Sequence, residues 1–182
     1  MMLAGDDEVL AKAASSDHAA FDTLYRRYVN RVYRYCYTHT HNAADAEDLT
    51  AQTFLAALES IRRYRGRGPF AAWLFTIARH KCNDYHRARY KRRDEALEKA
   101  ERLPDLAAPD LAAHAYRQRI VDCVQRVLHV LSEDRQEAIR LRFWGGLNTR
   151  ETAKVMGRSR AAVKMLVSRA IADLRERCLN EG

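Results

Sequence analysis

The residues from Asn148 to Leu166 carry the most specific chemistry in this sequence of 182 residues. A helix-turn-helix needs a small residue where two helices touch, a glycine in the turn and an apolar residue that seats the second helix. Ala153, Gly157 and Val163 meet these needs at spacings of four and six residues. The second helix then presents outwards Ser159, Arg160, Lys164, Ser168 and Arg169. These side chains suit phosphates and base edges in a major groove, whereas the alternative is an ordinary helical hairpin with a solvated basic face.

A second stretch, from Tyr64 to Arg93, interleaves aromatic and basic residues. The aromatic members are Tyr64, Phe70, Trp73, Tyr85 and Tyr90, and the basic members are Arg65, Arg67, Arg79, Lys81, Arg87 and Arg89. Aromatic rings stack on unpaired bases while arginines follow the backbone, as single-strand binding requires. Core packing explains Phe70 and Trp73 better than stacking does. It does not readily explain a polar set that comprises Arg65, His80, Asn83, Asp84 and Arg87.

Residues suited to catalysis or metal binding do not form a recognisable set. The sequence has no nucleophile–base–oxyanion set and no phosphate loop, so we expect no catalytic residues, no enzyme activity and no cofactor. The candidate metal ligands are Cys36, His39 and His41, or His80, Cys82 and His86. Neither group has zinc-finger spacing, because i, i+2 pairs on a helix do not converge, and we expect no bound metal. Without a C-x-x-C pair, the four cysteines are expected to be free thiols, buried or partly buried: Cys36, Cys82, Cys123 and Cys178.

Helices are expected to position the first half of these residues. One apolar stripe at helical spacing, which Asp17 can cap, comprises Phe21, Leu24, Tyr25, Tyr28, Val32 and Tyr35. A second stripe comprises Leu49, Phe54, Leu55, Leu58 and Ile61. It follows the acidic residues Asp45, Glu47 and Asp48, which we place in the first turn of a helix. A third helix is expected to begin near Phe70, with Trp73, Leu74 and Ile77 on its inner face.

The second half shows the same helical pattern. A stripe comprises Ile120, Val124, Val127, Leu128 and Leu131, and Ser132 is expected to cap the next helix, which Gly145 and Gly146 end. The segment from Asn148 to Glu151 has the spacing of a capping box. Ser159 is expected to cap a longer helix that runs towards Leu179. Because no β-alternating run of useful length occurs, we expect an all-α fold.

The charge divides the chain into two modules and a linker. Residues 1–93 carry a net charge of +6, residues 94–115 carry −4, and residues 116–182 carry +6. The acidic middle contains Pro104 and Pro109, so we expect two small helical domains joined by a flexible linker. The basic excess, in which arginine dominates, indicates nucleic acid or an anionic membrane as a partner without choosing between them. No apolar run approaches a membrane span and the acidic N-terminus lacks a signal peptide, so we expect a cytoplasmic protein with no membrane insertion of its own.

These motifs together resemble those of a bacterial sigma factor of the extracytoplasmic-function (ECF) group within the sigma-70 family. Asp45-Ala-Glu-Asp-Leu-Thr50 with Phe54-Leu55 resembles the segment that binds the polymerase clamp. Phe70 to Arg79, with Asp84, resembles the promoter-melting helix, and Leu131 to Gln136 with the helix-turn-helix resembles the second conserved domain. The first domain would be residues 1–93, the acidic linker 94–115 and the second domain 116–182.

The resemblance implies roles for particular residues. Contact with core RNA polymerase, at its beta-prime clamp, is implied for a set comprising Asp45, Glu47, Asp48, Gln52 and Phe54. The beta flap of the polymerase is a further implied contact. The minus-ten element of promoter DNA would be trapped as a melted non-template strand by Arg65, Arg67, His80, Asn83, Asp84 and Arg87. The minus-thirty-five element would be read by Arg158, Ser159, Arg160, Ala161, Lys164, Met165, Ser168 and Arg169. An anti-sigma factor is a further implied partner.

Three departures from the family pattern bear on these roles. Many relatives carry Gln-Glu where this chain has Ala51-Gln52, His80 stands where Asn is frequent, and Met165 replaces a common small polar residue. The clamp contact and the promoter sequence are therefore expected to differ from those of relatives at these positions. The alternative class is a conventional helix-turn-helix regulator with an N-terminal interaction domain, which would leave the clamp-like and melting-like segments without a purpose.

Overall fold

The protein is all-α in the part of the chain that its computed structural model describes, which comprises residues 4–93, 123 and 128–180. The first module contains α1 (Ala4–Ala13), α2 (His18–Thr40), α3 (Ala43–Ser60), the short 3-10 turn η1 (Ile61–Arg63) and α4 (Phe70–Arg93). The second contains α6 (Glu133–Ile139), the π-helical turn η2 (Arg140–Trp144), α7 (Thr149–Met156) and α8 (Arg160–Asn180). The predicted all-α fold is confirmed. The predicted linker, residues 94–115, lies outside the described residues.

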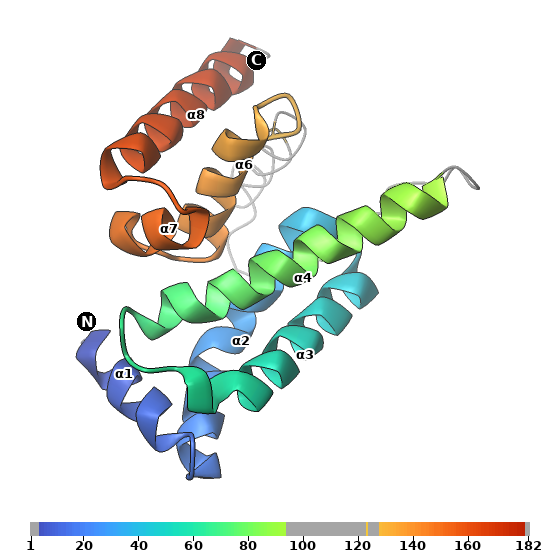
Figure 1. The fold of residues 1–182 in the computed structure, drawn as a ribbon. Coiled ribbons are helices and arrows are strands. Elements are labelled where there is room, and N and C mark those ends of the chain that lie inside the picture. Colours follow the sequence, from blue (N-terminus) through green and yellow to red (C-terminus); the bar gives the residue numbers. More distant parts are fainter. Residues whose placement is uncertain (1–3, 94–122, 124–127, 181–182) are drawn as a thin grey trace, which may run out of the picture.

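Helix α2 forms as its sequence pattern predicts. The Asp17 side chain accepts a hydrogen bond of 2.8 Å from the backbone N–H of Ala19, which confirms the predicted N-cap. The stripe residues Leu24, Val32 and Tyr35 are fully buried. The helix therefore forms the central element of the first module, with α1, α3 and α4 packed around it (Figure 1).

Helix α3 differs from its prediction in two respects. Asn42 caps it, and Asp45 is the acidic residue in its first turn; Glu47 and Asp48 lie beyond that turn, so the predicted dipole placement was wrong for these two. The predicted apolar stripe was also partly wrong, because Leu55 and Leu58 are 58% and 38% exposed. The predicted residues Leu49 and Phe54 are buried, and Thr53 and Ala57 complete the buried face at helical spacing.

Helix α4 begins at Phe70, as predicted, and crosses the whole first module (Figure 1). Its buried face includes Phe70, Leu74, Phe75, Ala78 and Cys82. Trp73 and Ile77 are partly buried against the same core. The interpretation of Phe70 and Trp73 as core residues is thus confirmed.

In the second module the turns follow the predicted residues, with one exception. Gly145 ends the π-helical turn after α6, and Gly157 ends α7 in the left-handed conformation (φ 63°) that glycine adopts without strain. Ser132 precedes α6 as predicted, but its side chain forms no capping hydrogen bond. Of the predicted stripe in this region, Leu128 and Leu131 are described and buried, whereas Ile120, Val124 and Val127 lie outside the described residues.

The cysteine prediction was wrong for one pair. Cys123 and Cys178 form a disulfide, with their Cα atoms 5.8 Å apart, beside the small core of the second module. Their 55-residue separation in sequence gives no sign that the two ends of this module meet. Cys36 and Cys82 are free and buried, as predicted, with their sulfur atoms 3.9 Å apart between α2 and α4.

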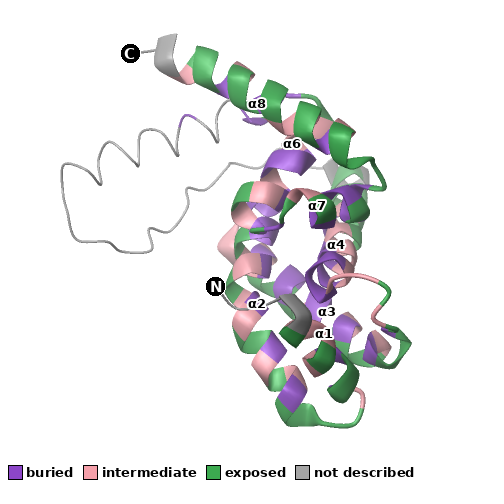
Figure 2. Ribbon diagram, turned by 90° about the vertical axis from the view of Figure 1, so that its left-hand side faces the viewer, coloured by how far each residue is buried: buried purple, intermediate pink, exposed green. Residues whose placement is uncertain are grey.

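The two modules pack against each other. A single buried apolar cluster extends from the first module into the second, where its members are Ala138, Leu141, Leu147, Ala153, Val155, Met156 and Val163. Figure 2 shows buried segments of α6 and α7 directed towards α2 and α4. Among the described residues, no helix has both the length and the apolar character required to cross a membrane.

Candidate nucleic-acid interface

The start of α7 is held by reciprocal hydrogen bonds. The Glu151 carboxylate accepts from the backbone N–H of Asn148 at 2.8 Å, and the Asn148 side chain accepts from the N–H of Glu151 at 3.0 Å. This confirms the predicted capping box. At the start of α8, the Ser159 hydroxyl accepts from the N–H of Ala162 at 3.1 Å, which confirms the second predicted cap.

The three residues predicted to seat a helix-turn-helix take those positions. Ala153 is 6% exposed between the helices, and the turn at Gly157 leaves open space around its Cα. Val163, on the inner side of α8, is fully buried. The helix-turn-helix geometry therefore rests on the small, flexible and apolar residues that the sequence places there.

The exposed face of α8 follows from helical geometry. All eight residues predicted to read the minus-thirty-five element are exposed: Arg158, Ser159, Arg160, Ala161, Lys164, Met165, Ser168 and Arg169. At about 100° per residue, Ala161, Lys164, Met165 and Ser168 form one stripe, and Arg160 and Arg169 flank it on opposite sides. Such a face suits base edges at its centre and phosphates at its margins. Arg158 is already engaged, because its guanidinium pairs with Asp134 at 2.7 Å.

A second polar face lies on α4 and the loop before it. His80, Asn83, Asp84 and Arg87 follow one another at three- and four-residue spacing, so they share one side of the helix. Asn83 is half-buried and the other three are exposed, with Arg87 3.3 Å from Asp84.

Tyr64 fixes the loop that carries Arg65 and Arg67. Its hydroxyl donates to the carbonyl of Gly68 at 2.7 Å, and its ring packs against Phe70 and Trp73. The two arginine side chains remain exposed.

Few of the aromatic residues in this region are available for base stacking. Tyr64 and Phe70 are buried, and the Tyr85 hydroxyl donates to Asp45 at 2.7 Å. Tyr90 is 80% exposed, and Trp73 is partly buried. The basic side chains, rather than a row of aromatic rings, dominate this face.

The residues predicted to bind polymerase lie on α3. Glu47 and Asp48 are exposed, and Gln52 donates to Asp48 at 2.7 Å. The resemblance implies a polymerase contact for Phe54, but this side chain is 5% exposed and packs edge-on against Tyr25. It therefore belongs to the core.

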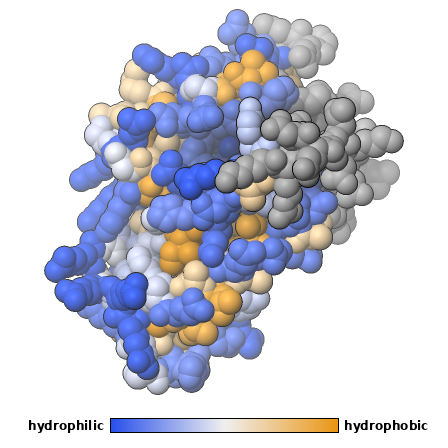
Figure 3. Space-filling model, turned by 45° about the vertical axis from the view of Figure 1, so that its right-hand side comes forward, coloured by the Kyte–Doolittle hydropathy of each residue, from blue (hydrophilic) through white to orange (hydrophobic). Residues whose placement is uncertain are grey.

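The apolar surface on this helix comes from Leu55 and Leu58 instead. Figure 3 shows apolar side chains interrupting a hydrophilic face in the lower half of the molecule, which the first module forms.

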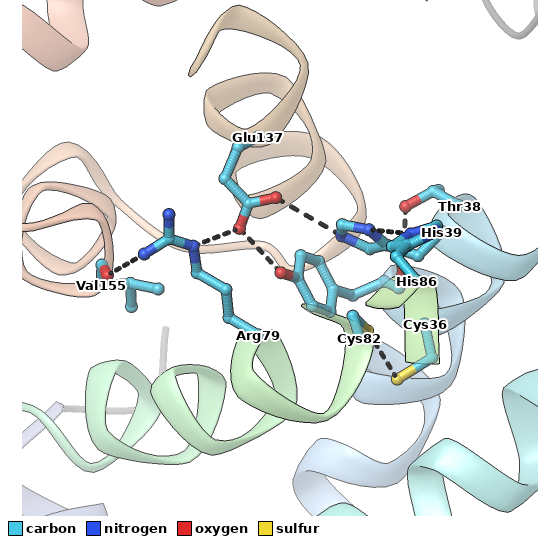
Figure 4. A network of polar contacts seen from close by, with 9 residues as sticks. Cys36, Thr38, His39, Arg79, Cys82, His86, Glu137 and Val155 are labelled. Carbon is cyan, nitrogen blue, oxygen red and sulfur yellow. Dashed lines mark hydrogen bonds and ion pairs between the residues drawn. The ribbon is translucent and has the colours of Figure 1, made fainter. Parts of the chain in front are cut away.

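Sequence reasoning missed a buried polar cluster between the modules. Glu137 on α6 is 8% exposed and accepts a hydrogen bond from the Tyr35 hydroxyl at 2.7 Å (Figure 4). His39 and Arg79 each bring a nitrogen atom to 3.4 Å from its carboxylate. Burial alone would raise the pKa of Glu137, but His39, Tyr35 and Arg79 together hold it below its usual value. The sequence offered one signal for this cluster. His39 is four residues from Tyr35, and Glu137 is four residues from Leu141, so each of these polar residues lies on the buried face of its helix.

Metal chemistry has no support in the described part of the chain. There, no group of three or more His, Cys, Asp or Glu side chains is placed to hold an ion. The two predicted ligand sets meet only in pairs, because Cys36 lies 3.9 Å from Cys82 and His39 lies 3.4 Å from both His86 and Glu137. Two helical modules, each presenting a polar and basic face on one long helix, define the class of protein: an all-α nucleic-acid-binding protein.

Comparisons with known proteins identify the family. Sigma-70 region 2 matches residues 24–92, and Sigma-70, region 4 matches residues 121–174. The ECF RNA polymerase sigma factor SigD of Mycobacterium tuberculosis is 32% identical over 183 aligned positions, which cover 97% of this chain and 85% of SigD. The ECF RNA polymerase sigma factor BldN of Streptomyces coelicolor is 38% identical over 92% of this chain, which spans 63% of BldN.

Structural similarity agrees with the sequence matches. A solved structure of CnrH in complex with the cytosolic domain of CnrY has a TM-score of 0.69, with 26% sequence identity, and the match covers 94% of this chain and 96% of CnrH. The chain belongs to the ECF sigma factors of the sigma-70 family.

Proposed function

We propose that this chain is an alternative sigma factor that brings core RNA polymerase to promoters and starts transcription there without being an enzyme itself. One observation carries the proposal: two separate exposed faces, on α4 and α8, occur in the two matched family regions and in the family order. A conventional helix-turn-helix regulator would account for the face on α8 alone and is not favoured.

Each face is assigned a different part of the promoter. The stripe on α8, with Lys164 at its centre and Arg169 at its margin, would read the minus-thirty-five element as duplex DNA. The face on α4, together with Arg65 and Arg67, would hold the melted non-template strand of the minus-ten element. Its lack of several free aromatic rings fits a strand held largely by its backbone, since arginines and amides contact phosphate and sugar.

The polymerase-binding surface is assigned to the outer side of α3. Glu47 and Asp48 place negative charge on a protein that is otherwise basic, next to the exposed apolar side chains of Leu55 and Leu58. This combination fits a partner surface that is basic with an apolar centre. The proposal therefore keeps Asp45, Glu47, Asp48 and Gln52 and replaces Phe54 by its two exposed neighbours.

The remaining assignments also follow from family membership. Residues 1–93 and 116–182 are proposed as the two functional domains, with residues 94–115 as the connecting linker. A protein partner that masks the polymerase-binding and promoter-binding faces is proposed as an anti-sigma factor, and the cytoplasm as the site of action.

Reconstitution with core polymerase on a randomised promoter library tests this function. The wild-type chain should select two elements about 25 base pairs apart and render thymines near the start site reactive to permanganate. Lys164→Ala should lower output from the selected promoter by about 5- to 150-fold, which corresponds to a loss of about 1–3 kcal/mol.

The matched control is Arg177→Ala, which removes one positive charge from the opposite side of the same helix. Equal output from the two variants would contradict the assignment of the α8 face. Failure of the wild-type chain to open any promoter with core polymerase would contradict the function itself.

A further inference from the structure

A cavity of about 700 Å³ lies where the first module meets the second. Helix α4 lines one side of it with Asn83 and Arg87, and α6 lines the other side with Glu133 and Gln136. Small-molecule sites in proteins commonly have about 300–1,000 Å³ and a few convergent polar groups. The cavity therefore has the size and the polar lining of a site for a metabolite.

Arg140, the first residue of η2, lines this cavity with a cation that has no close counter-ion. Its Nε is buried without a hydrogen bond, and no described residue forms an ion pair with its guanidinium. Burial lowers the pKa of Arg140, an effect that the Glu137 carboxylate opposes from one turn away. Because a buried ion that has lost its hydration is normally paired, a guanidinium in this position is suited to an anionic ligand.

The acidic residues that line the cavity are engaged elsewhere or exposed. Glu137 has Arg79 among its partners, at 3.4 Å (Figure 4). The Asp134 carboxylate is 2.7 Å from the guanidinium of Arg158. Glu133 forms no ion pair with any described residue, but it is exposed to solvent, which screens its charge. The buried part of the cavity therefore keeps an excess of positive charge.

Three histidines lie within the influence of this positive charge. Burial is the main cause of the lowered pKa of His39, His41 and His86. The charge of Arg140 lowers each of these pKa values further, and that of His86 falls to about 4. His39 and His86, whose ring nitrogens lie 3.4 Å apart, are therefore neutral at about pH 7. Their imidazoles can donate or accept hydrogen bonds, and a bound anion would offset the charge beside them.

From this geometry we infer that the cavity is a binding site for a small phosphate ester, a nucleotide or a sugar phosphate, whose phosphate pairs with Arg140. Arg87 adds a second, exposed cation, so the two guanidinium groups suit a doubly charged phosphate better than a singly charged carboxylate. The amides of Asn83 and Gln136 and the carboxylate of Glu133 would then meet the hydroxyl or amino groups of the ligand.

The site overlaps the face of α4 that is proposed to hold the minus-ten strand. Asn83 and Arg87 belong to both, and the contact of Arg87 with Asp84, at 3.3 Å, is exposed and weak enough to be exchanged for a phosphate. A bound ligand would therefore compete with the promoter strand for these side chains. This consequence rests on the proposed function, whereas ligand binding itself does not.

Calorimetry on the purified full chain in chloride buffer tests the site. Adenosine 5′-monophosphate and ribose 5-phosphate are the probes, and adenosine is the control without a phosphate. Arg140→Gln should weaken binding of the esters at least about tenfold, because a charge-assisted contact is lost, whereas Arg160→Gln, which removes an exposed positive charge from α8, should bind them as the wild type does. Tighter binding of adenosine 5′-monophosphate would assign the ligand to the nucleotides, and equal affinity to the sugar phosphates. No binding of either ester at about 10 mM, or equal binding by the two variants, would overturn the inference.

A spectroscopic measurement and a second variant separate loss of the site from loss of the fold. On addition of adenosine 5′-monophosphate, the imidazole proton resonances of His39 and His86 should shift, whereas those of His18, exposed at the start of α2, should not. Arg87→Gln changes an exposed side chain and should also weaken binding, with the helix content unchanged. Shifts that leave His39 and His86 unaffected would place the ligand elsewhere and overturn the inference.

Promoter opening measures the competition between ligand and strand. With core polymerase and without nucleoside triphosphates, the wild-type chain should give fewer permanganate-reactive thymines when adenosine 5′-monophosphate is added. Arg140→Gln should open the promoter normally and resist this inhibition. An equal response of the two chains, whether inhibition or none, would overturn the competition. If neither chain opens a promoter even without ligand, the proposed function fails, and the calorimetry still decides whether the site exists.

Discussion

Loss of the disulfide between Cys123 and Cys178 is expected to destabilise the second module substantially. The two residues are 55 positions apart and close a loop around the small core of Leu128, Leu131 and Ile139. In the chain-entropy model, a cross-link over a loop of this length removes enough freedom from the unfolded chain to contribute about 4 kcal/mol. This contribution is large beside a core of so few apolar residues. Cys178→Ser should therefore lower the free energy of unfolding by about 2–4 kcal/mol.

Tryptophan fluorescence during urea unfolding can measure this loss of stability. The sequence contains two tryptophans, and Trp144 packs against the core that the disulfide closes. In a Trp73→Phe background, the fluorescence of Trp144 reports on the second module during urea unfolding. The oxidised protein should unfold at higher urea than either the reduced protein or Cys178→Ser, and reductant should not shift Cys178→Ser further. Identical midpoints for the oxidised, reduced and substituted proteins would refute the reasoning.

Three further outcomes are expected. Asn148→Ala should cost about 1 kcal/mol of stability through loss of the capping box, measurable by urea unfolding; no change would show that the cap is not used in solution. Asp48→Arg should reduce capture of core polymerase in a pull-down while leaving the melting temperature unchanged, whereas Glu59→Arg, at the exposed far end of α3, should bind normally. Burial lowers the pKa of His39 more than the Glu137 carboxylate raises it, so His39 is neutral in the folded chain and takes up a proton on unfolding below pH about 6.5. Stability should therefore fall as the pH is lowered from 7 to 5.5, and a profile equally steep in His39→Phe would contradict this assignment.

Local chemistry made much of the fold predictable. The caps at Asp17 and Asn148 lie at helix starts because a short polar side chain satisfies backbone N–H groups that the helix leaves free. The helix-turn-helix could be located because Gly157 and Val163 meet requirements that act within about ten residues. The exposed residues on α8 follow from the same helical period.

Features that depend on contacts between distant parts of the chain could not be predicted from local sequence patterns. Periodicity assigned Leu55 and Leu58 to the core, but which side of a helix is covered depends on its neighbours, and no described element covers that side of α3. The pairing of Cys123 with Cys178 depends on where Cys123 meets the end of α8, which no pattern within either segment specifies. The role of Glu137 as a contact between the modules could be recognised only from the structure, in which the Tyr35 hydroxyl donates to its carboxylate.

The shared apolar cluster has a consequence for synthesis of the chain. Phe75 is fully buried, and part of its cover is the turn at Gly145, which is synthesised much later. Gly145 follows residue 93 by 52 residues and therefore leaves the ribosome about 3–10 s later, at 5–20 residues per second. For that time the ring of Phe75 lacks the part of its cover that the turn at Gly145 supplies. The nascent first module should therefore recruit chaperones that bind apolar segments, and a chain that stalls before Gly145 should be degraded faster than one that stalls after it.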